Sequence, residues 1–280
     1  MLVFTTDKKR LLAHFKKDPV LFAYHIGDLD DFFFPDCLWP AAFGLRGGID
    51  DVLLMYMGGD TPTLLAFGLS DRFAALLQGY LPIAPGRFLC HFQKQFRGLL
   101  RKHARETSLG THLKMKLDET RFAEFVSEEK RNVRRPRAVL SPADMPDQLQ
   151  ATIRLNSSHE DQLRDLYAAA YPRSYFTPRM LQTGKFFGYR DNGNIVAVAG
   201  VHVVSDERRI AVLGNIATHP DYRGRGLATL VTHRLAGELV SEGKMVCLNV
   251  KADNTAAIAC YRKLGFVAVH ECEEAILEVK

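Results

Sequence analysis

The chain has 280 residues, of which 47% are hydrophobic and 25% charged, and its formal net charge is +5. This composition is typical of globular proteins and excludes collagen-like, coiled-coil and wholly disordered chains. The length predicts about two domains, and apolar runs such as Ile195 to Val201 are much shorter than a membrane-spanning helix requires.

Cysteine occurs at five widely separated positions and never as a Cys-x-x-Cys pair. This spacing favours reduced thiols over a zinc site, and the first ten residues do not resemble a secretory signal. We therefore expect a cytoplasmic protein that binds neither a metal nor a membrane. The cysteines are Cys37, Cys90, Cys247, Cys260 and Cys272.

Residues 1–137 predict a mixed α/β domain. Helix-like sequence over 7–33 precedes several apolar runs, and glycine pairs at 47–48 and 58–59 mark turns between them. Helix and strand patterns then alternate. The predicted strands are 38–45, 52–57, 63–69, 88–91 and 112–117, and the predicted helices are 71–80 and 92–105.

The basic excess of the chain lies in residues 81–137, which hold fourteen lysines and arginines against six acidic residues. Within it, residues 92–106 place aromatic and leucine side chains at helical spacing, with cations between them. Such a helix can contact nucleic acid, but its aromatic face more often packs in a core. Because no nucleic-acid motif accompanies the charge, we do not expect nucleic acid as a partner.

A domain boundary is expected between 134 and 150. Pro136, Pro142 and Pro146 discourage any continuous helix or strand there. We therefore predict a linker at 138–150, between an N-terminal domain (1–137) and a C-terminal domain (151–280).

The C-terminal domain begins with a strand at 151–156 and a helix that Ser157 or Ser158 can cap. A short helix opens at Thr177-Pro178, and a turn at 191–193 predicts a hairpin. Strands and helices then alternate to the end. The remaining predicted elements are strands 185–190, 194–204, 208–220 and 244–250, helices 227–243 and 254–265, and one or two strands from 266.

An arginine-glycine turn lies where the strand at 208–220 gives way to the next helix. Gly224 and Gly226 allow a tight turn and a close approach by a ligand. The exposed N–H groups of a helix start, with Arg223 and Arg225 beside them, can bind a phosphate or pyrophosphate. The turn fits neither the P-loop nor the GxGxxG pattern, so by itself it is also compatible with a helix start that only needs flexible residues.

The segment 223–228, Arg-Gly-Arg-Gly-Leu-Ala, resembles the pyrophosphate signature (Arg/Gln)-x-x-Gly-x-(Gly/Ala) of the GNAT superfamily of N-acetyltransferases. Downstream, Asn254 opens the next helix, and 261–266 resembles the family's Tyr-x-x-x-Gly-Phe ending of that helix. The resemblance covers about residues 151–280. It implies the α/β GNAT fold, a mixed central sheet with flanking helices, and acetyl-CoA as the acyl donor.

The resemblance also implies a cofactor-binding role for particular residues. Gly214-Asn215 interrupts an apolar strand, as a bulge or splay would, and in the family this opens a slot for pantetheine. A backbone donor near Asn215 and Ile216 would polarise the thioester carbonyl. The implied cofactor-binding residues are Asn215, Ile216, Ala217, Thr218, Arg223, Gly224, Arg225, Gly226, Leu227, Ala228, Thr229 and Asn254.

Tyr261 is the candidate general acid, which in the family protonates the departing CoA thiolate. It lies two helical turns from Asn254, so both can share one helix face, although a core tyrosine would show the same spacing. His202 is a candidate base, with a core histidine, water or no base as alternatives. Cys260 is interpreted as a core residue.

The N-terminal domain repeats the strand–helix–strand order but has only Gly68 to Arg72 where the phosphate signature would stand. One hypothesis is a degenerate GNAT-like half, as in two-domain members similar to glycine N-acyltransferase and in the FR47-like group; the alternative is an unrelated α/β domain. Acceptor specificity would come from Tyr171, Tyr175 and Phe176, unless these aromatics only cover the core.

The sequence therefore predicts an acyl-CoA-dependent N-acyltransferase that moves acetyl from acetyl-CoA to a primary amine by direct attack. A small-molecule amine is the expected acceptor, and the protein is expected to be a monomer or homodimer. The alternative is a non-catalytic protein that binds or senses acyl-CoA, or that associates with nucleic acid, on the same fold.

Overall fold

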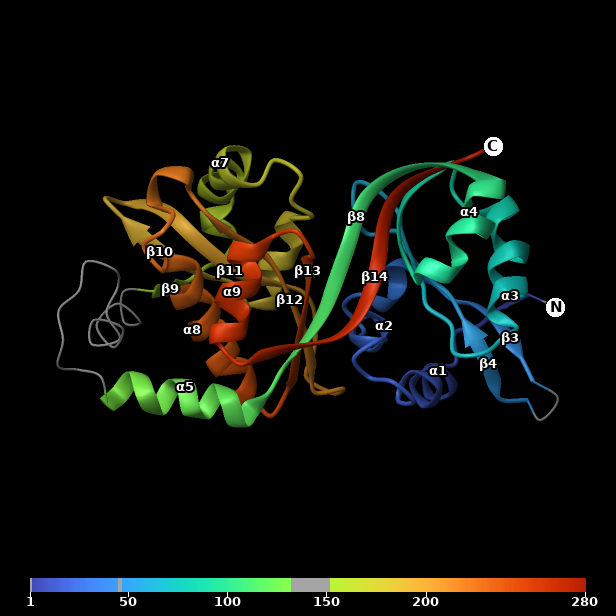
Figure 1. Cartoon of the computed structure of the whole chain (residues 1–280), viewed down its shortest axis with the longest axis horizontal. Helices are drawn as coiled ribbons and strands as arrows, with labels where there is room; N and C mark the ends of the chain where they lie inside the picture. The colour runs from blue at the N-terminus through green and yellow to red at the C-terminus, as the bar shows by residue number, and fades with distance from the viewer. Residues whose placement is uncertain (1, 45–46, 132–151) are drawn as a thin grey trace. The chain divides into compact units, whose positions relative to one another are not determined.

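The computed structural model describes residues 2–44, 47–131 and 152–280, so the predicted linker at 138–150 lies outside the described residues. The chain forms a mixed sheet with flanking helices, and it divides into two compact units (Figure 1). The first unit comprises 1–114, 250–253 and 268–280, and the second comprises 115–249 and 254–267.

The main sheet of the first unit has the strand order β2-β5-β6-β7-β14-β8. β6 and β7 are parallel and joined through α3, whereas β7 and β14 are antiparallel. The core of this unit is apolar and aromatic, and it includes the buried side chains of Phe73, Tyr80 and Phe88. The elements are β1 (Val3–Phe4), α1 (Lys8–Phe15), α2 (Ala23–Gly27), β2 (Cys37–Leu38), β3 (Pro40–Phe43), β4 (Ile49–Val52), β5 (Leu54–Tyr56), β6 (Thr63–Ala66), α3 (Phe73–Tyr80), β7 (Arg87–Phe92), α4 (Arg97–His103), β8 (Ala104–Leu117) and β14 (Phe266–Val279).

The second unit carries the order β13-β12-β11-β10-β9. Neighbouring strands are antiparallel except β12 and β13, which are parallel and joined through α8. The elements are α5 (Glu119–Arg131), β9 (Thr152–Arg154), α7 (Glu160–Ala170), η5 (Pro178–Thr183), β10 (Phe187–Asp191), β11 (Asn194–Ser205), β12 (Ile210–Thr218), α8 (Leu227–Ser241), β13 (Met245–Lys251) and α9 (Thr255–Lys263).

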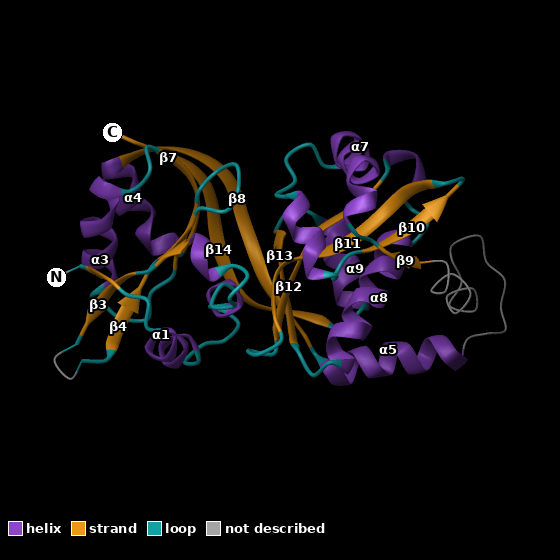
Figure 2. Cartoon of the chain, turned by 180° about the vertical axis from the view of Figure 1, so that it is seen from behind, coloured by secondary structure: helices purple, strands orange, loops and turns teal. Residues whose placement is uncertain are grey.

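Helices α7 and α8 cover opposite faces of this sheet, and Figure 2 shows both beside β10 and β11. The ring of Phe187 lies 4.8 Å from the guanidinium of Arg234 on α8. The preceding residue, Phe186, points the other way. Its ring packs against Phe176, 6.0 Å between centroids, and Phe176 in turn packs against Tyr167 of α7 at 5.0 Å. Successive residues of an extended chain alternate between faces, which explains the division.

The short helix predicted at Thr177-Pro178 is present as a 3-10 helix, and the tail predicted as one or two strands is one long strand. Two features of the second unit differ from the sequence analysis. Asn156, rather than Ser157 or Ser158, caps the turn before α7, since its side chain accepts from the Ser158 N–H at 3.0 Å. Helix α5 was not predicted; its phenylalanines Phe122 and Phe125 pack on His233 of α8.

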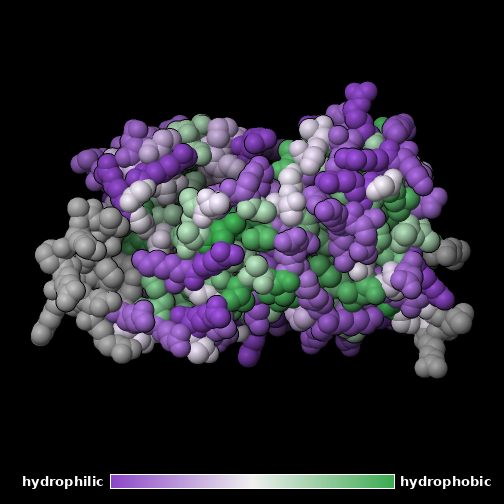
Figure 3. Space-filling model, viewed as in Figure 1, coloured by the Kyte–Doolittle hydropathy of each residue, from purple (hydrophilic) through white to green (hydrophobic). Residues whose placement is uncertain are grey.

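Most of the surface in Figure 3 is hydrophilic, with hydrophobic residues in smaller groups. Large apolar side chains such as Phe4 and Ile83 are exposed, and apolar atoms are a normal part of globular surfaces. Within the described ranges, none of the helices is both long enough and apolar enough to cross a membrane.

Candidate functional site

The start of α8 has the backbone that the arginine-glycine turn predicted. Gly224 and Gly226 have φ angles of +76° and +77°, in the left-handed region that favours glycine. Gly226 is the N-cap, and no side chain of the described residues caps the helix there. The first N–H groups of α8 therefore have no intrahelical partner and, with the helix dipole, favour an anion.

The two arginines of this turn are exposed but held by backbone carbonyls. Arg223 donates from Nε to Thr218 O at 3.3 Å and from Nη2 to Ala170 O at 3.2 Å. Arg225 donates to Asp221 O at 2.9 Å, and its guanidinium lies 4.7 Å from the ring centre of Tyr222. Both positive charges thus stay beside the uncapped helix start.

The side chains in the first turn of α8 play different parts. Leu227 is buried in the core and Ala228 is half-buried. The Thr229 hydroxyl lies 3.2 Å from the Cys260 sulfur, so it faces α9. Cys260 is only partly buried, and this partial burial raises the pKa of its thiol. Any contact between residues 227–229 and an anion would therefore use backbone N–H groups.

Strands β12 and β13 separate where the sequence predicted a splay. Their parallel register runs from Ile210 and Met245 to Leu213 and Leu248, although β12 continues to Thr218. In the same region the pairing of β12 with β11 is interrupted by a bulge. Asn215 has a φ of +54°, which is unusual for a residue other than glycine. Asn215 and Ile216 thus lie at the interruption of the β11–β12 pairing, whereas Ala217 and Thr218 pair with β11 but not with β13.

Three polar side-chain atoms flank this separation. Asn215 Oδ1 and Thr218 Oγ1 lie on β12, and Asn249 Nδ2 lies on β13, one residue beyond the last paired position. Each is buried and has no hydrogen-bond partner in the part of the chain that the structure describes. Buried polar groups normally find partners, so these atoms fit a polar ligand between the strands. Asn249 was not singled out from the sequence, because one asparagine in an apolar strand carries no distinctive signal.

Asn215 itself is buried, with 3% of its surface exposed. Its backbone carbonyl accepts from the Tyr167 hydroxyl at 2.8 Å. Its side-chain amide donates to Tyr175 O at 3.4 Å and contacts Met180 Sδ at 3.3 Å. Tyr167 was missed because, together with Leu163 and Leu166, it follows the pattern of a core residue on an amphipathic helix.

His202 of β11 lies over Gly214. A Cβ added at Gly214 would stand 2.0 Å from two atoms of the imidazole, so only glycine leaves room for it. The ring of Tyr175 lies 6.1 Å from the imidazole, edge to face. Burial lowers the pKa of His202 to about 4. The imidazole is therefore neutral at pH 7, able to accept a proton but weakly basic.

Tyr261 is buried in α9, with its ring 5.9 Å from that of Phe266. Burial raises the pKa of its hydroxyl well above the usual value, and Cys260 and Tyr171 contribute. The phenol is therefore protonated at neutral pH. Asn254, by contrast, is exposed. It is the N-cap of α9, and its Oδ1 accepts from the Ala257 N–H at 3.1 Å.

The three predicted acceptor-side aromatics have different surroundings. Tyr175 adjoins His202, whereas Phe176 packs between Tyr167 and Phe186 as a core side chain would. Tyr171 is 45% exposed, and its charge contributes, after burial, to the raised pKa values of Tyr167 and Tyr261.

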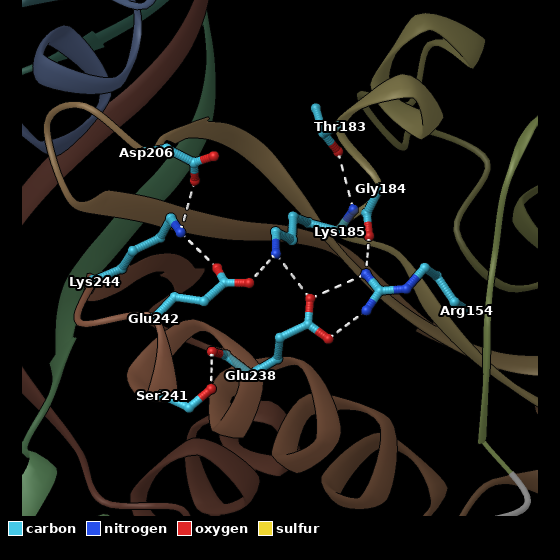
Figure 4. Close-up of polar contacts among 9 residues, drawn as sticks. All are labelled: Arg154, Thr183, Gly184, Lys185, Asp206, Glu238, Ser241, Glu242 and Lys244. Atoms are coloured by element: carbon cyan, nitrogen blue, oxygen red, sulfur yellow. Dashed lines mark hydrogen bonds and ion pairs between the residues drawn. The ribbon is translucent and has the colours of Figure 1, made fainter.

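A chain of ion pairs lies at the opposite end of α8 and is shown in Figure 4. Glu238 accepts from Arg154 and from Lys185, and Lys185 also reaches Glu242. Lys244 continues the chain to Glu242 and, at 2.7 Å, to Asp206. Burial opposes ionisation of Glu238, but the hydrogen bonds from its cationic partners outweigh it and lower the pKa. The charges balance locally, so this network serves stability.

Across the described ranges, no cluster of His, Cys, Asp and Glu is arranged to hold a metal.

Residues 153–266 match the model of the acetyltransferase (GNAT) family. The [ribosomal protein bS18]-alanine N-acetyltransferase of Escherichia coli K12 is 39% identical over 102 residues, which are 35% of this chain and 67% of that protein. The N-alpha-acetyltransferase RimI of Mycobacterium tuberculosis is 33% identical over 104 residues, 36% of this chain and 61% of that protein.

Solved structures resemble the whole chain. A Drosophila protein aligns with a TM-score of 0.69 at 14% identity, covering 99% of this chain and 98% of that one. A tandem GNAT protein from the clavulanic acid biosynthesis pathway aligns with a TM-score of 0.56 at 14% identity, covering 99% and 98%. At these identities the likeness concerns the fold.

Proposed function

Because this chain belongs to the acetyltransferase (GNAT) family, we propose that it transfers the acetyl group of acetyl-CoA to a primary amine, which attacks the thioester directly. The observation that carries this proposal is the start of α8. Two glycines with left-handed backbone conformation and an uncapped helix terminus lie beside two arginines there. This is a site for a pyrophosphate, which acetyl-CoA contains.

The strand separation supports a place for the rest of the acyl donor. Pantetheine carries amide groups, and the unpaired Asn215 Oδ1, Thr218 Oγ1 and Asn249 Nδ2 offer acceptor and donor atoms for them. The backbone of Ile216 and Ala217 lies in the same stretch of β12. The thioester carbonyl would then lie near the Asn215–Ile216 peptide, whose N–H would stabilise the developing oxyanion.

The chemistry needs one proton donor and one proton acceptor. The amine nitrogen forms a bond to the carbonyl carbon, and collapse of the tetrahedral intermediate breaks the carbon–sulfur bond. Tyr261 gives its phenolic proton to the departing thiolate, since its raised pKa keeps it protonated. The proton lost by the amine goes to water or to His202. The low pKa of His202 makes its imidazole a weaker base than that of an ordinary histidine.

The acceptor is an amine, and we propose a small molecule that approaches from the side of Tyr171 and Tyr175. A peptide α-amine is the second candidate, because two relatives are an alanine N-acetyltransferase and an N-alpha-acetyltransferase. The five cysteines all lie in described segments and form no disulfides, which supports a reducing, cytoplasmic setting.

The test is thiol release from acetyl-CoA with a panel of amino acids, polyamines, aminoglycosides and alanine-starting peptides. Turnover with any member supports the proposal, whereas binding of CoA without turnover on the whole panel would favour a non-catalytic CoA-binding protein. Tyr261→Phe should lower kcat by roughly 10²- to 10⁴-fold. Tyr80→Phe is the matched control, because Tyr80 is also buried and burial raises its pKa to about 12, but it belongs to the first unit.

A further inference from the structure

The peptide group between Asn215 and Ile216 is held by a residue that neither the sequence motifs nor the comparisons point to. Tyr167 lies on α7, 48 positions earlier in the chain, and is 4% exposed. Its hydroxyl donates to the Asn215 carbonyl at 2.8 Å, a normal length for a strong O–H···O bond. Burial raises the pKa of this hydroxyl, so it remains a donor at all physiological pH values.

This hydrogen bond fixes the direction of a second group. A trans peptide is planar, and its C=O and N–H point in opposite directions. Because the Asn215 carbonyl points to Tyr167, the Ile216 N–H points away from α7. A rotation of this plane would turn both groups together. The hydroxyl of Tyr167 therefore sets the orientation of the Ile216 N–H without touching it.

The left-handed backbone of Asn215 is a second local feature of this peptide. Its φ of +54° is tolerated by asparagine better than by other non-glycine residues, but it is still less common than the ordinary right-handed or extended conformations. The side-chain amide of Asn215 is also held, by its contacts with Tyr175 O and Met180 Sδ. The peptide is thus fixed at its carbonyl and at the preceding side chain.

We propose that Tyr167 is a positioning residue for acyl transfer, because its hydroxyl orients the Ile216 N–H that polarises the thioester carbonyl. This inference rests on the proposed function. In this role Tyr167 acts through the peptide group that it holds, and not by contact with the thioester or the amine. Its aromatic ring also packs on Phe176, 5.0 Å between centroids, and a phenylalanine would preserve that packing. One substitution, Tyr167→Phe, can therefore distinguish the contribution of the hydroxyl from that of the ring.

The experiment compares the wild-type protein with Tyr167→Phe. We expect kcat to fall about 10- to 100-fold, somewhat less than the full loss of an oxyanion donor, while KM for acetyl-CoA changes less than about threefold. The second measurement is the infrared carbonyl band of bound acetyl-CoA labelled with ¹³C at the thioester carbon. It should shift to lower frequency on binding to the wild type, and most of that shift should be lost in Tyr167→Phe.

A structural role alone would not move the carbonyl band. If Tyr167→Phe keeps the wild-type band and kcat, or loses activity with an unchanged band, the proposal is overturned. Asn215→Gly is a second variant, since glycine adopts a positive φ without strain but lacks the ties to Tyr175 and Met180; it should lower kcat and weaken the band shift in the same direction. Tyr80→Phe should leave both readouts unchanged. A wild type that does not bind acetyl-CoA would instead refute the proposed function.

Discussion

Substituting alanine for Gly214 tests the packing of His202 directly. The added Cβ would stand 2.0 Å from Cδ2 and Nε2 of the imidazole and 2.6 Å from Cε1. Carbon contacts are normally 3.5–4.0 Å long, so the ring has to retreat by about 1.5 Å. The φ of Gly214 is not among the positive values of this chain, so the clash with the imidazole, rather than backbone strain, sets the cost.

The expected loss of stability is about 1–3 kcal/mol, the usual effect of one extra carbon in a well-packed site. For a chain of this size that corresponds to a fall in Tm of roughly 2–10 °C. Chemical denaturation followed by circular dichroism gives the free energy of unfolding. Thiol release measured from pH 6 to 9 reports in parallel whether displacement of His202 changes the reaction.

Gly237→Ala is the matched control. Gly237 lies inside α8, and its Cβ would meet only Phe122, at an ordinary 3.8 Å. Because alanine is a better helix former, this variant should gain about 0.8–1.0 kcal/mol. His202→Ala should relieve the clash, so the double variant with Gly214→Ala should lose less than the two single variants together. If Gly214→Ala is within 0.5 kcal/mol of wild type, or its cost is unchanged in the double variant, the packing argument is wrong.

Three further predictions concern charge. Arg223→Ala should weaken CoA binding by about 10- to 100-fold in calorimetry, since a charged hydrogen bond contributes roughly 1.5–3 kcal/mol; unchanged affinity would exclude Arg223 from the phosphate site. Glu238→Gln should lower the free energy of unfolding by about 1–3 kcal/mol because the partly buried Lys185 and the exposed Arg154 both lose an ionised partner that is itself largely buried, whereas Glu160→Gln, from an exposed pair on α7, should cost less than about 0.5 kcal/mol. Burial lowers the pKa values of His202 and His233 to about 4, so below pH 6.5 the unfolded chain binds protons that the folded chain does not. Stability should be highest above pH 6.5 and should fall toward pH 4 by up to about 1.4 kcal/mol per pH unit for each histidine, and a flat profile in that range would show that the imidazoles are not desolvated.

Several elements of this protein were predictable because their signals are local. The turn at Arg223 to Gly226 was identified from adjacent residues, and the structure gives both glycines the positive φ that such a turn requires. The interruption at Gly214-Asn215 likewise marked the end of the register between β12 and β13. Helix and strand periodicity gave the order of most elements, since it depends on residues only a few positions apart.

Boundaries and side-chain roles depended on contacts that the local pattern does not contain. Asn254 and Tyr261 were predicted to be able to share one helix face, and the structure adds that Asn254 is an exposed N-cap while Tyr261 is buried. Helical spacing gives the direction of a side chain around its own axis, but not what lies opposite it. For the same reason, α5 was missed although Phe122 and Phe125 pack on α8.

The sequence by itself determined the fold class, the family signature and the position of the anion-binding turn, because each is encoded by neighbouring residues. Only the tertiary structure decided which side chains surround the strand separation. The bond from Tyr167 to Asn215 joins residues 48 positions apart, and the space for His202 comes from a glycine on the adjacent strand. Such pairs carry no local pattern, since their energy appears only when distant segments pack together.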